Sequence, residues 1–484
     1  MPHSPAESAT RHAGPLRSRR ALLATVALLA LVAVALIAAT AMDLGFLRPR
    51  LERTASEALG QNVRIEGAVG LDLLAGPALT LDAVRVGDGE TPLFRAERLR
   101  LRPSVVELLQ GTVSLAAVHA SGAAIHLVRG EEGSWPAAGG GDAAGETPSL
   151  PAISLKDTSF RYRDEATGPE IQADGCQLTL PQIRLAAAPD RATLQRLWLD
   201  GALECARVQR GALVISGLHA NLQADGGQLA ATPLRAAIFD GELDGELRAD
   251  VTGGTPAFEL AYRLRGFALE AFLNNLASEA EASGRMDLEV TLEARGHDRA
   301  GLTRSLNGRI RLGGESLRVE GVDLDQRLAE YRSTQRFNLV DVGAFLFAGP
   351  AGLAVTKGYD YTRLLRGGDG STQIRQLASV WRITDGIAAV EDVALATGSN
   401  RLAALGALDI PEQRFQDFRV LLVDERGCAV MEQAITGTFA DPGIAETSMV
   451  ASLLGPLTSL VERGVEALTP DDCEPVYTGS VSPP

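Results

Sequence analysis

The chain has few side chains suited to acid–base, nucleophilic or metal chemistry. Beyond residue 43 its histidines are His119, His126, His219 and His297. His119 and His126 flank a Ser-Gly pair and lack the i, i+4 spacing that places two zinc ligands on one helix face. A G-x-S-x-G nucleophile elbow, a P-loop and a dinucleotide-binding fingerprint are also missing from the sequence. We therefore expect ordinary surface or strand histidines, no catalytic residues, no metal site, no cofactor and no enzyme activity.

The cysteines are the other reactive side chains, and they are Cys176, Cys205, Cys428 and Cys473. All four lie after residue 43, in the part of the chain that we expect to be exported (see below). Cysteines in an oxidising compartment can form disulfides. Four cysteines allow three connectivities. Because each local pair falls within one stretch of strands, we expect Cys176 to pair with Cys205 and Cys428 with Cys473. The alternative is that they are free buried thiols.

The charge balance excludes one class of partner. The sequence holds 46 basic against 61 acidic residues, a net charge of −15, and part of its positive charge clusters before residue 21. Nucleic acid is therefore not an expected partner. The many acidic residues alternate with apolar ones, which is typical of the solvated faces of strands.

Alternating hydrophobicity dominates most of the chain and predicts half-buried strands. The clearest case runs from Met286 to Leu292, where apolar side chains at 286, 288, 290 and 292 alternate with Asp287, Glu289 and Thr291. Asp-Gly pairs are strong hairpin signals. They predict turns at Asp174-Gly175, Asp200-Gly201, Asp225-Gly226, Asp240-Gly241, Asp244-Gly245 and Asp385-Gly386. A helix-rich fold is excluded.

A few short helices are expected between the strands. Residues 46–59 form one that Gly60 ends, residues 103–111 a second, and residues 269–277 a brief turn. Residues 450–468 are an amphipathic helix. The apolar segment 338–354 is interrupted by Gly349-Pro350, so it is too short to span a membrane. It is either a helical element over the sheet or a membrane or partner contact.

Residues 21–42 form an uncharged apolar run that predicts a membrane anchor. As a helix, its roughly 22 residues measure about 33 Å, enough to cross a hydrocarbon core of about 30 Å. Four arginines precede it, at 11, 17, 19 and 20, which predicts a cytoplasmic N-terminus and an exported remainder. In the alternative interpretation Ala39-Thr40-Ala41 is a signal-peptidase site, but the apolar run exceeds the usual signal length.

Two regions resemble the AsmA family of Gram-negative envelope proteins. In the N-terminal region, within residues 63–135, the matching segments are IEGAVGLDLLAGPALTLDAVRVGDG, PSVVELLQGTVSL and IHLVRGEEGSW. The C-terminal region matches through ASGRMDLEVTLEARG with SLNGRI, FNLVDVGAFLFAGPAGLAVTKGYDY and ITGTFADPGI. The middle matches only by its strand pattern.

The expected fold is mainly β, a single N-terminal transmembrane helix followed by an elongated antiparallel sheet with a few short capping helices. The resemblance implies that this sheet is curled into a repeating β-groove. We expect a cytoplasmic tail at 1–20, the anchor at 21–42, and an AsmA-like β region at 43–135. A flexible linker at 136–150 leads to the groove body at 151–445, AsmA-like from about 282, and residues 446–484 form a helix and tail.

An apolar strand face lined by Leu, Val, Ile and Ala suits acyl chains, because methylene burial requires no hydrogen-bond geometry. The candidate groove residues are Leu79, Leu81, Met286, Leu288, Val290, Leu292, Ile310 and Leu312. The resemblance implies a single-pass protein of the bacterial inner membrane that binds phospholipid in the periplasm. It would support lipid transport to the outer membrane and its integrity, with an outer-membrane or periplasmic partner. The alternative is a non-catalytic scaffold for outer-membrane protein assembly.

Overall fold

Antiparallel strands make up most of the computed structural model. It describes residues 44–72, 76–89, 92–104, 107, 114–130, 149–164, 170–186, 192–275, 281–321, 323–334, 370–444, 448–449 and 473–484. The predicted anchor at 21–42, the apolar segment 338–354, the helix at 450–468 and residues 136–148 of the predicted linker lie outside these residues. Among the described helices, none has the length and apolar character needed to cross a bilayer.

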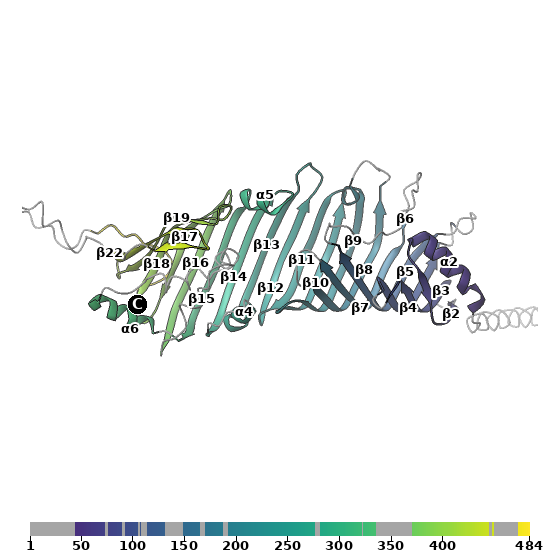
Figure 1. Ribbon diagram of the computed structural model, residues 1–484, viewed down its shortest axis with the longest axis horizontal. Coiled ribbons are helices and arrows are strands. Elements are labelled where there is room, and N and C mark those ends of the chain that lie inside the picture. Colours follow the sequence, from purple (N-terminus) through teal and green to yellow (C-terminus); the bar gives the residue numbers. More distant parts are fainter. Residues whose placement is uncertain are drawn as a thin grey trace, which may run out of the picture. The chain divides into compact units, whose positions relative to one another are not determined.

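The described chain forms two compact units, the first reaching His126 and the second starting at Leu127. In unit 1, the short helix η1 and the helix α2 precede β-strands (Figure 1). Their bounds are Gly45–Leu47 for η1, Arg48–Leu59 for α2, Val63–Ile65 for β1, Val69–Asp72 for β2, Ala78–Val86 for β3, Phe94–Pro103 for β4 and Leu115–Arg129 for β5, whose residues from Leu127 onward belong to unit 2.

Helix α2 covers one side of unit 1. It ends at Gly60, which adopts the left-handed conformation that glycine tolerates best (φ 62°), as the sequence predicts. The Glu52 carboxylate accepts a hydrogen bond from the Ile65 backbone N–H at 2.7 Å. Ser56 Oγ accepts one from the Val63 N–H at 2.9 Å. These side chains satisfy edge groups of β1 that would otherwise be free to pair with another strand.

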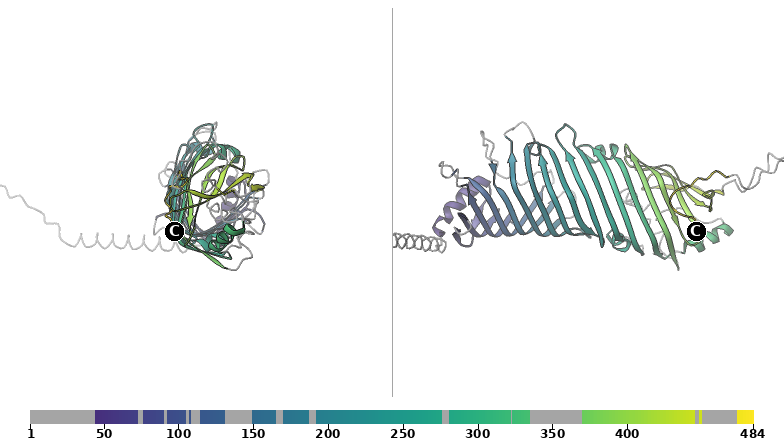
Figure 2. Two further views of the ribbon diagram at one scale, coloured as in Figure 1. Left: turned by 90° about the vertical axis from the view of Figure 1, so that its left-hand side faces the viewer. Right: turned by 180° about the vertical axis from the view of Figure 1, so that it is seen from behind.

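Unit 2 is a long, open antiparallel sheet (Figures 1 and 2). Its strands are β6 (Ser149–Leu150), β7 (Ala152–Asp164), β8 (Ile171–Leu185), β9 (Leu197–Arg210), β10 (Leu213–Asp225), β11 (Gln228–Ile238), β12 (Gly241–Asp250), β13 (Ala257–Ala268), β14 (Ala282–Arg295), β15 (Asn307–Glu320), β16 (Ser371–Thr384), β17 (Ile387–Ala396), β18 (Arg401–Asp409), β19 (Arg414–Val423), β20 (Ala429–Gly437), β21 (Pro442–Ile444) and β22 (Ser448–Met449). Short helices lie between some of them: η2 (Thr193–Arg196), α4 (Leu269–Asn275), α5 (Arg299–Arg304) and α6 (Leu324–Thr334).

From β7 to β20, every two consecutive strands pair with each other. The mainly β fold, the long antiparallel sheet and the small number of helices agree with the predicted fold class. The predicted helix at 269–277 corresponds to α4, whereas α5 and α6 were not predicted. Of the helix predicted at 103–111, Glu107 is helical, but Pro103 ends strand β4 and Ser104 is irregular, and the other residues lie outside the described part of the chain.

The sheet bends around its core at the C-terminal end of unit 2. Trp381 on β16 stacks on Phe418 of β19, with ring centroids 6.3 Å apart. Three strand spacings separate β16 from β19, about 14 Å in a flat sheet. The contact therefore requires curvature, and the end-on view in Figure 2 shows these strands on a curved surface.

Three of the predicted turns form, and three do not. Asp225-Gly226, Asp240-Gly241 and Asp385-Gly386 each contribute to a turn that joins two consecutive paired strands, as predicted. Asp174-Gly175, Asp200-Gly201 and Asp244-Gly245 were wrongly predicted as turns, because they lie inside β8, β9 and β12.

Close packing explains these mid-strand glycines. A Cβ at Gly245 would lie 2.5 Å from the Ala261 carbonyl oxygen of the next strand, and one at Gly175 would lie 2.9 Å from Ala206 Cβ. Glycine is therefore favoured at Gly245 because a neighbouring strand approaches closely, and not because the chain reverses. At Gly175 the left-handed backbone (φ 62°) favours glycine as well.

Candidate apolar binding face

Cross-strand register gathers the apolar residues of unit 2 on one face, because directly opposed residues of an antiparallel pair share a face. One row of opposed residues runs through Leu203, Ala220, Leu234, Gly245, Tyr262, Val290, Ile310 and Trp381. A second row runs through Gly201, Leu222, Ala231, Leu247, Leu260, Leu292, Gly308 and Ile383. The apolar face is therefore continuous from β9 to β16.

Part of this face is accessible to solvent. Leu247 on β12 is 43% exposed and Phe258 on β13 is 36% exposed. Leu222, Leu229 and Leu260 beside them are half-buried. We call these five residues the open apolar face. An exposed group of large apolar side chains on neighbouring strands marks a candidate binding surface.

The same face is buried farther along the sheet, from β14 onward. Met286, Leu288, Val290, Ile310 and Leu312 are each between 3% and 7% exposed and belong to one cluster with the Trp381 and Phe418 rings. Leu292 packs against this cluster. We call it the closed apolar core. The structure thus brings six of the eight predicted groove residues together, in the buried part of the face.

The other two predicted groove residues belong to unit 1. Leu81 on β3 is 5% exposed and lies in a small cluster with Val63, Ile65, Val69 and Val84, and Leu79 packs against that cluster. Helix α2 contributes Leu51 and Ala55 to it. Leu79 and Leu81 therefore lie in a core of their own within unit 1.

Three aromatic rings extend the closed apolar core: Phe267 belongs to its cluster, and Phe239 and Phe272 pack against it. Phe239, Phe267 and Phe272 contact one another, with centroids 5.4 to 6.4 Å apart. Tyr262 opposes Gly245 on one side and Val290 on the other. Burial raises the pKa of its phenol above the ordinary value.

Polar and charged residues cross the opposite face of the same strands, and their charges alternate in sign from Arg235 to Arg311. The row runs through Glu204, His219, Arg235, Asp244, Arg263, Glu289 and Arg311. Glu289 lies between two cations, 3.0 Å from Arg263 and 3.2 Å from Arg311. The outer face is therefore solvated, and its charged side chains form ion pairs with one another. The two faces of the sheet thus differ in polarity.

The Glu289 carboxylate predicts a measurable pH dependence. The hydrogen bond from Arg263, with the further positive charge of Arg311, holds its pKa below the ordinary value of 4.5. A lowered carboxyl pKa stabilises the fold above pH 4.5, and this stability is lost as the pH falls through the folded-state pKa. Because the pair is partly exposed, we expect an effect below about 1 kcal/mol. Urea unfolding of Glu289→Gln should show a deficit at pH 7 that shrinks at pH 3, and an equal deficit at both values would contradict the prediction.

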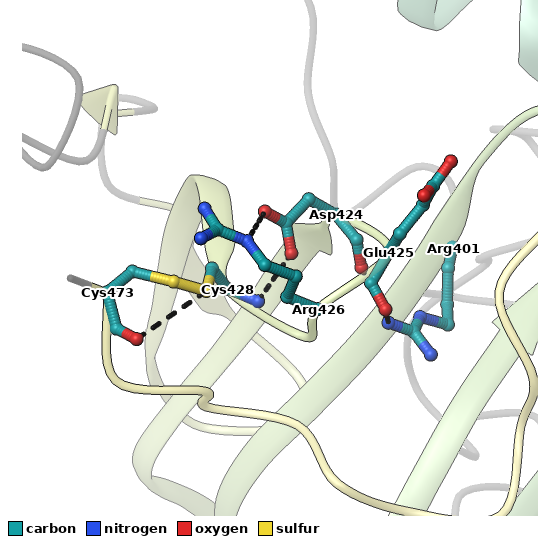
Figure 3. Close-up of a disulfide and its surroundings, with 6 residues drawn as sticks. All are labelled: Arg401, Asp424, Glu425, Arg426, Cys428 and Cys473. Carbon is teal, nitrogen blue, oxygen red and sulfur yellow. Dashed lines mark hydrogen bonds and ion pairs between the residues drawn. A yellow bond between two sulfur atoms is a disulfide. The ribbon is translucent and has the colours of Figure 1, made fainter. Parts of the chain in front are cut away.

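Both expected cysteine pairs are joined in the structure. Cys176 on β8 opposes Cys205 on β9, with Cα atoms 4.0 Å apart. Cys428 is bonded to Cys473, 45 residues later in the sequence (Figure 3). Asp424 lies beside this second disulfide and accepts a hydrogen bond from the Cys428 N–H at 2.8 Å. Among the described residues, one group of three has potential metal-ligand atoms close together, and it consists of Asp424, Cys428 and Cys473. The disulfide uses both sulfur atoms, so they are not available as thiolates.

The histidines are scattered among the elements. His119 and His126 lie on β5, His219 lies on β10, and His297 is exposed just before α5. His126 Nδ1 is 2.9 Å from the Pro92 carbonyl oxygen. His219 is 3.3 Å from Glu204 within the outer row of charges. They do not gather at one site.

A family model matches residues 17–144 and 149–393, and its description is the AsmA family. The chain belongs to the AsmA family. The match covers most of the chain, including residues 149–281, where the sequence resemblance rested only on the strand pattern. No curated protein and no solved structure matches the chain.

The open apolar face of this AsmA-family chain was missed from the sequence. The signal was present, because Phe258, Leu260, Tyr262 and Leu264 alternate with polar or small residues along β13. Leu243 and Leu247, however, are separated by Asp244-Gly245, which imitates a turn. Because this pair was predicted to be a turn, strand β12 was not predicted, and neither was the accessible part of the apolar face.

Proposed function

We propose that this AsmA-family protein is a non-catalytic envelope protein that binds phospholipid acyl chains on the open apolar face. The observation that carries the proposal is the exposure of Leu247 and Phe258 in a continuous apolar face. We further propose that residues 21–42 anchor it in the inner membrane, with the bulk of the chain in the periplasm. There it supports lipid transport to the outer membrane, together with a periplasmic or outer-membrane partner.

The chemistry of the open apolar face favours acyl chains over a compact polar ligand. Its five residues are aliphatic or aromatic hydrocarbon, and burying each methylene of a ligand against such side chains stabilises a complex by about 0.8 kcal/mol. Because the face is accessible, a charged headgroup can remain in water while the chains are buried. This avoids the large cost of placing an ion in an apolar environment.

The proposal is tested by mass spectrometry of lipids that co-purify with residues 44–484, expressed in the periplasm and washed free of detergent. We expect phospholipid near stoichiometric amounts. In the double variant Leu247→Asp, Phe258→Asp, the amount of bound phospholipid should fall at least about tenfold, because two charges now face the acyl chains. Both positions are exposed, so circular dichroism and the melting temperature should change little.

The matched control is Ser216→Asp, which adds one charge on the outer face of β10. Ser216 is exposed and opposes Arg207. This variant should retain its lipid. Equal lipid in all three proteins would contradict the proposal. A folded fragment that carries no lipid would instead favour the alternative function, a scaffold for outer-membrane protein assembly.

A further inference from the structure

A second apolar cluster lies on the outer face of the sheet, at the C-terminal end of unit 2. Ala394, Ala396, Ala403, Leu421 and Val423 point away from the closed apolar core. We call this surface the strap groove. Strands β17 to β19 are thus buried on both faces here, whereas the outer face of β9 to β15 is solvated and charged. The alanines leave room for other side chains above them.

Residues 473–484, which we call the C-terminal strap, fill this groove. Tyr477 is 6% exposed and Val481 is 1% exposed, and both belong to the same cluster as the groove residues. The Arg401 guanidinium lies 5.4 Å from the centre of the Tyr477 ring. Tyr477 and Val481 are therefore the two buried apolar anchors of the strap, four residues apart, whereas Val476 is 38% exposed.

Side chains of the sheet hold the backbone of the strap in the manner of a bound peptide. Gln376 Nε2 donates to the Ser480 carbonyl at 3.3 Å, and Gln376 Oε1 accepts from the Ser482 N–H at 3.1 Å. Asp392 accepts from the Ser480 N–H at 2.9 Å and from the Tyr477 hydroxyl at 2.7 Å. Burial and the Asp392 hydrogen bond raise the pKa of Tyr477, so the phenol stays a donor.

Arg401 completes this recognition. It is 5% exposed, and it donates to the carbonyl of Val481. It also donates to the carbonyls of Asp424 and Glu425, which lie beside it in Figure 3. A buried charge is costly unless it is satisfied by hydrogen bonds. One of the three carbonyl acceptors comes from the strap, so an occupied groove stabilises the buried cation. The Cys428 to Cys473 disulfide then ties the N-terminal end of the strap to the sheet.

We propose that the strap groove is a peptide-binding site whose occupant is the chain's own C-terminal strap, held there by the disulfide. The site recognises an extended segment with an aromatic residue followed four positions later by an aliphatic one. The strap is a tethered ligand and not an integral layer of the sheet. The groove therefore stays folded when the strap leaves it, and then accepts a peptide of the same sequence in trans.

The test uses a host variant of the full chain that carries Cys428→Ser, Cys473→Ser, Tyr477→Gly and Val481→Asp. Its own strap can no longer occupy the groove. A fluorescein-labelled peptide of residues 474–484 should bind it saturably. Binding should weaken about tenfold or more when the host also carries Gln376→Ala, because two hydrogen bonds are lost. A peptide with Val481→Asp should weaken by at least as much.

Two controls bracket the result. The oxidised wild-type chain should not bind the peptide, because a tethered strap occupies the groove at a high effective concentration. The Cys176→Ser, Cys205→Ser variant should behave like the wild type, since its strap remains tethered. A folded host that binds no peptide overturns the proposal, and so does equal affinity for the Val481→Asp peptide.

Hydrogen exchange on the wild-type chain tests the same proposal without substitutions in the groove. Adding a phosphine reductant should accelerate exchange in residues 474–484 while β16 to β20 stay protected. Loss of protection in β16 to β20 together with the strap, or a host variant that fails to fold, overturns the proposal. Either result would make the strap an integral part of the sheet.

Discussion

Leu288→Asp should lower the free energy of unfolding by about 4 kcal/mol or more, a loss at the extreme end for single substitutions. Leu288 is 7% exposed and opposes Leu264 and Leu312 in the closed apolar core. An aspartate there would place an unpaired carboxyl group among hydrocarbon side chains. Urea unfolding followed by circular dichroism at pH 7 measures the change.

Thr291→Asp on the same strand is the matched control for this experiment. Thr291 is exposed on the outer face and opposes Arg309. This variant should change stability by less than about 0.5 kcal/mol. If Leu288→Asp were as stable as the control, this part of the apolar face would be accessible and not a closed core.

Trp381→Ala should cost about 3 to 5 kcal/mol of unfolding free energy, as expected for removing a fully buried indole. Trp381 is 2% exposed, stacks on Phe418 across the bend, and donates from Nε1 to Ser379 Oγ at 2.8 Å. Truncation leaves both a cavity and a buried hydroxyl without this donor. Urea unfolding of the purified chain measures the loss.

Trp381→Phe separates the two contributions. It keeps a ring against Phe418 but lacks the N–H group, so we expect a loss of about 1 to 2 kcal/mol. Equal losses for the alanine and phenylalanine variants would mean that the hydrogen bond, and not ring packing, stabilises the bend.

The alternation of side chains was sufficient to predict the mainly β fold. Met286 to Leu292 shows why: every second residue is apolar, and the structure buries Met286, Leu288 and Val290 against the neighbouring strands, with Leu292 partly buried beside them. Turn prediction was weaker, because Asp-Gly has two uses in this sheet. At Asp225-Gly226 it reverses the chain, and at Asp244-Gly245 it lets strand β13 approach β12.

Exposure along the apolar face could not be predicted from the alternation. Val290 and Leu247 are both apolar strand residues of similar context, yet the first is 3% exposed and the second 43%. The difference arises from what lies above each strand, which depends on segments distant in sequence. The strap was missed for the same reason, because Tyr477 and Val481 lie in a stretch with no periodicity and their partners are far away in the chain.

The strictly sequential pairing from β7 to β20 also constrains how the length of such a protein can change. Removing two consecutive strands, such as β11 and β12, would leave β10 and β13 running in opposite directions and able to pair. Removing one strand would make its former neighbours parallel, and their connection would be too short. Insertions and deletions in unit 2 should therefore add or remove whole hairpins. The number of strands in the sheet would then change in steps of two.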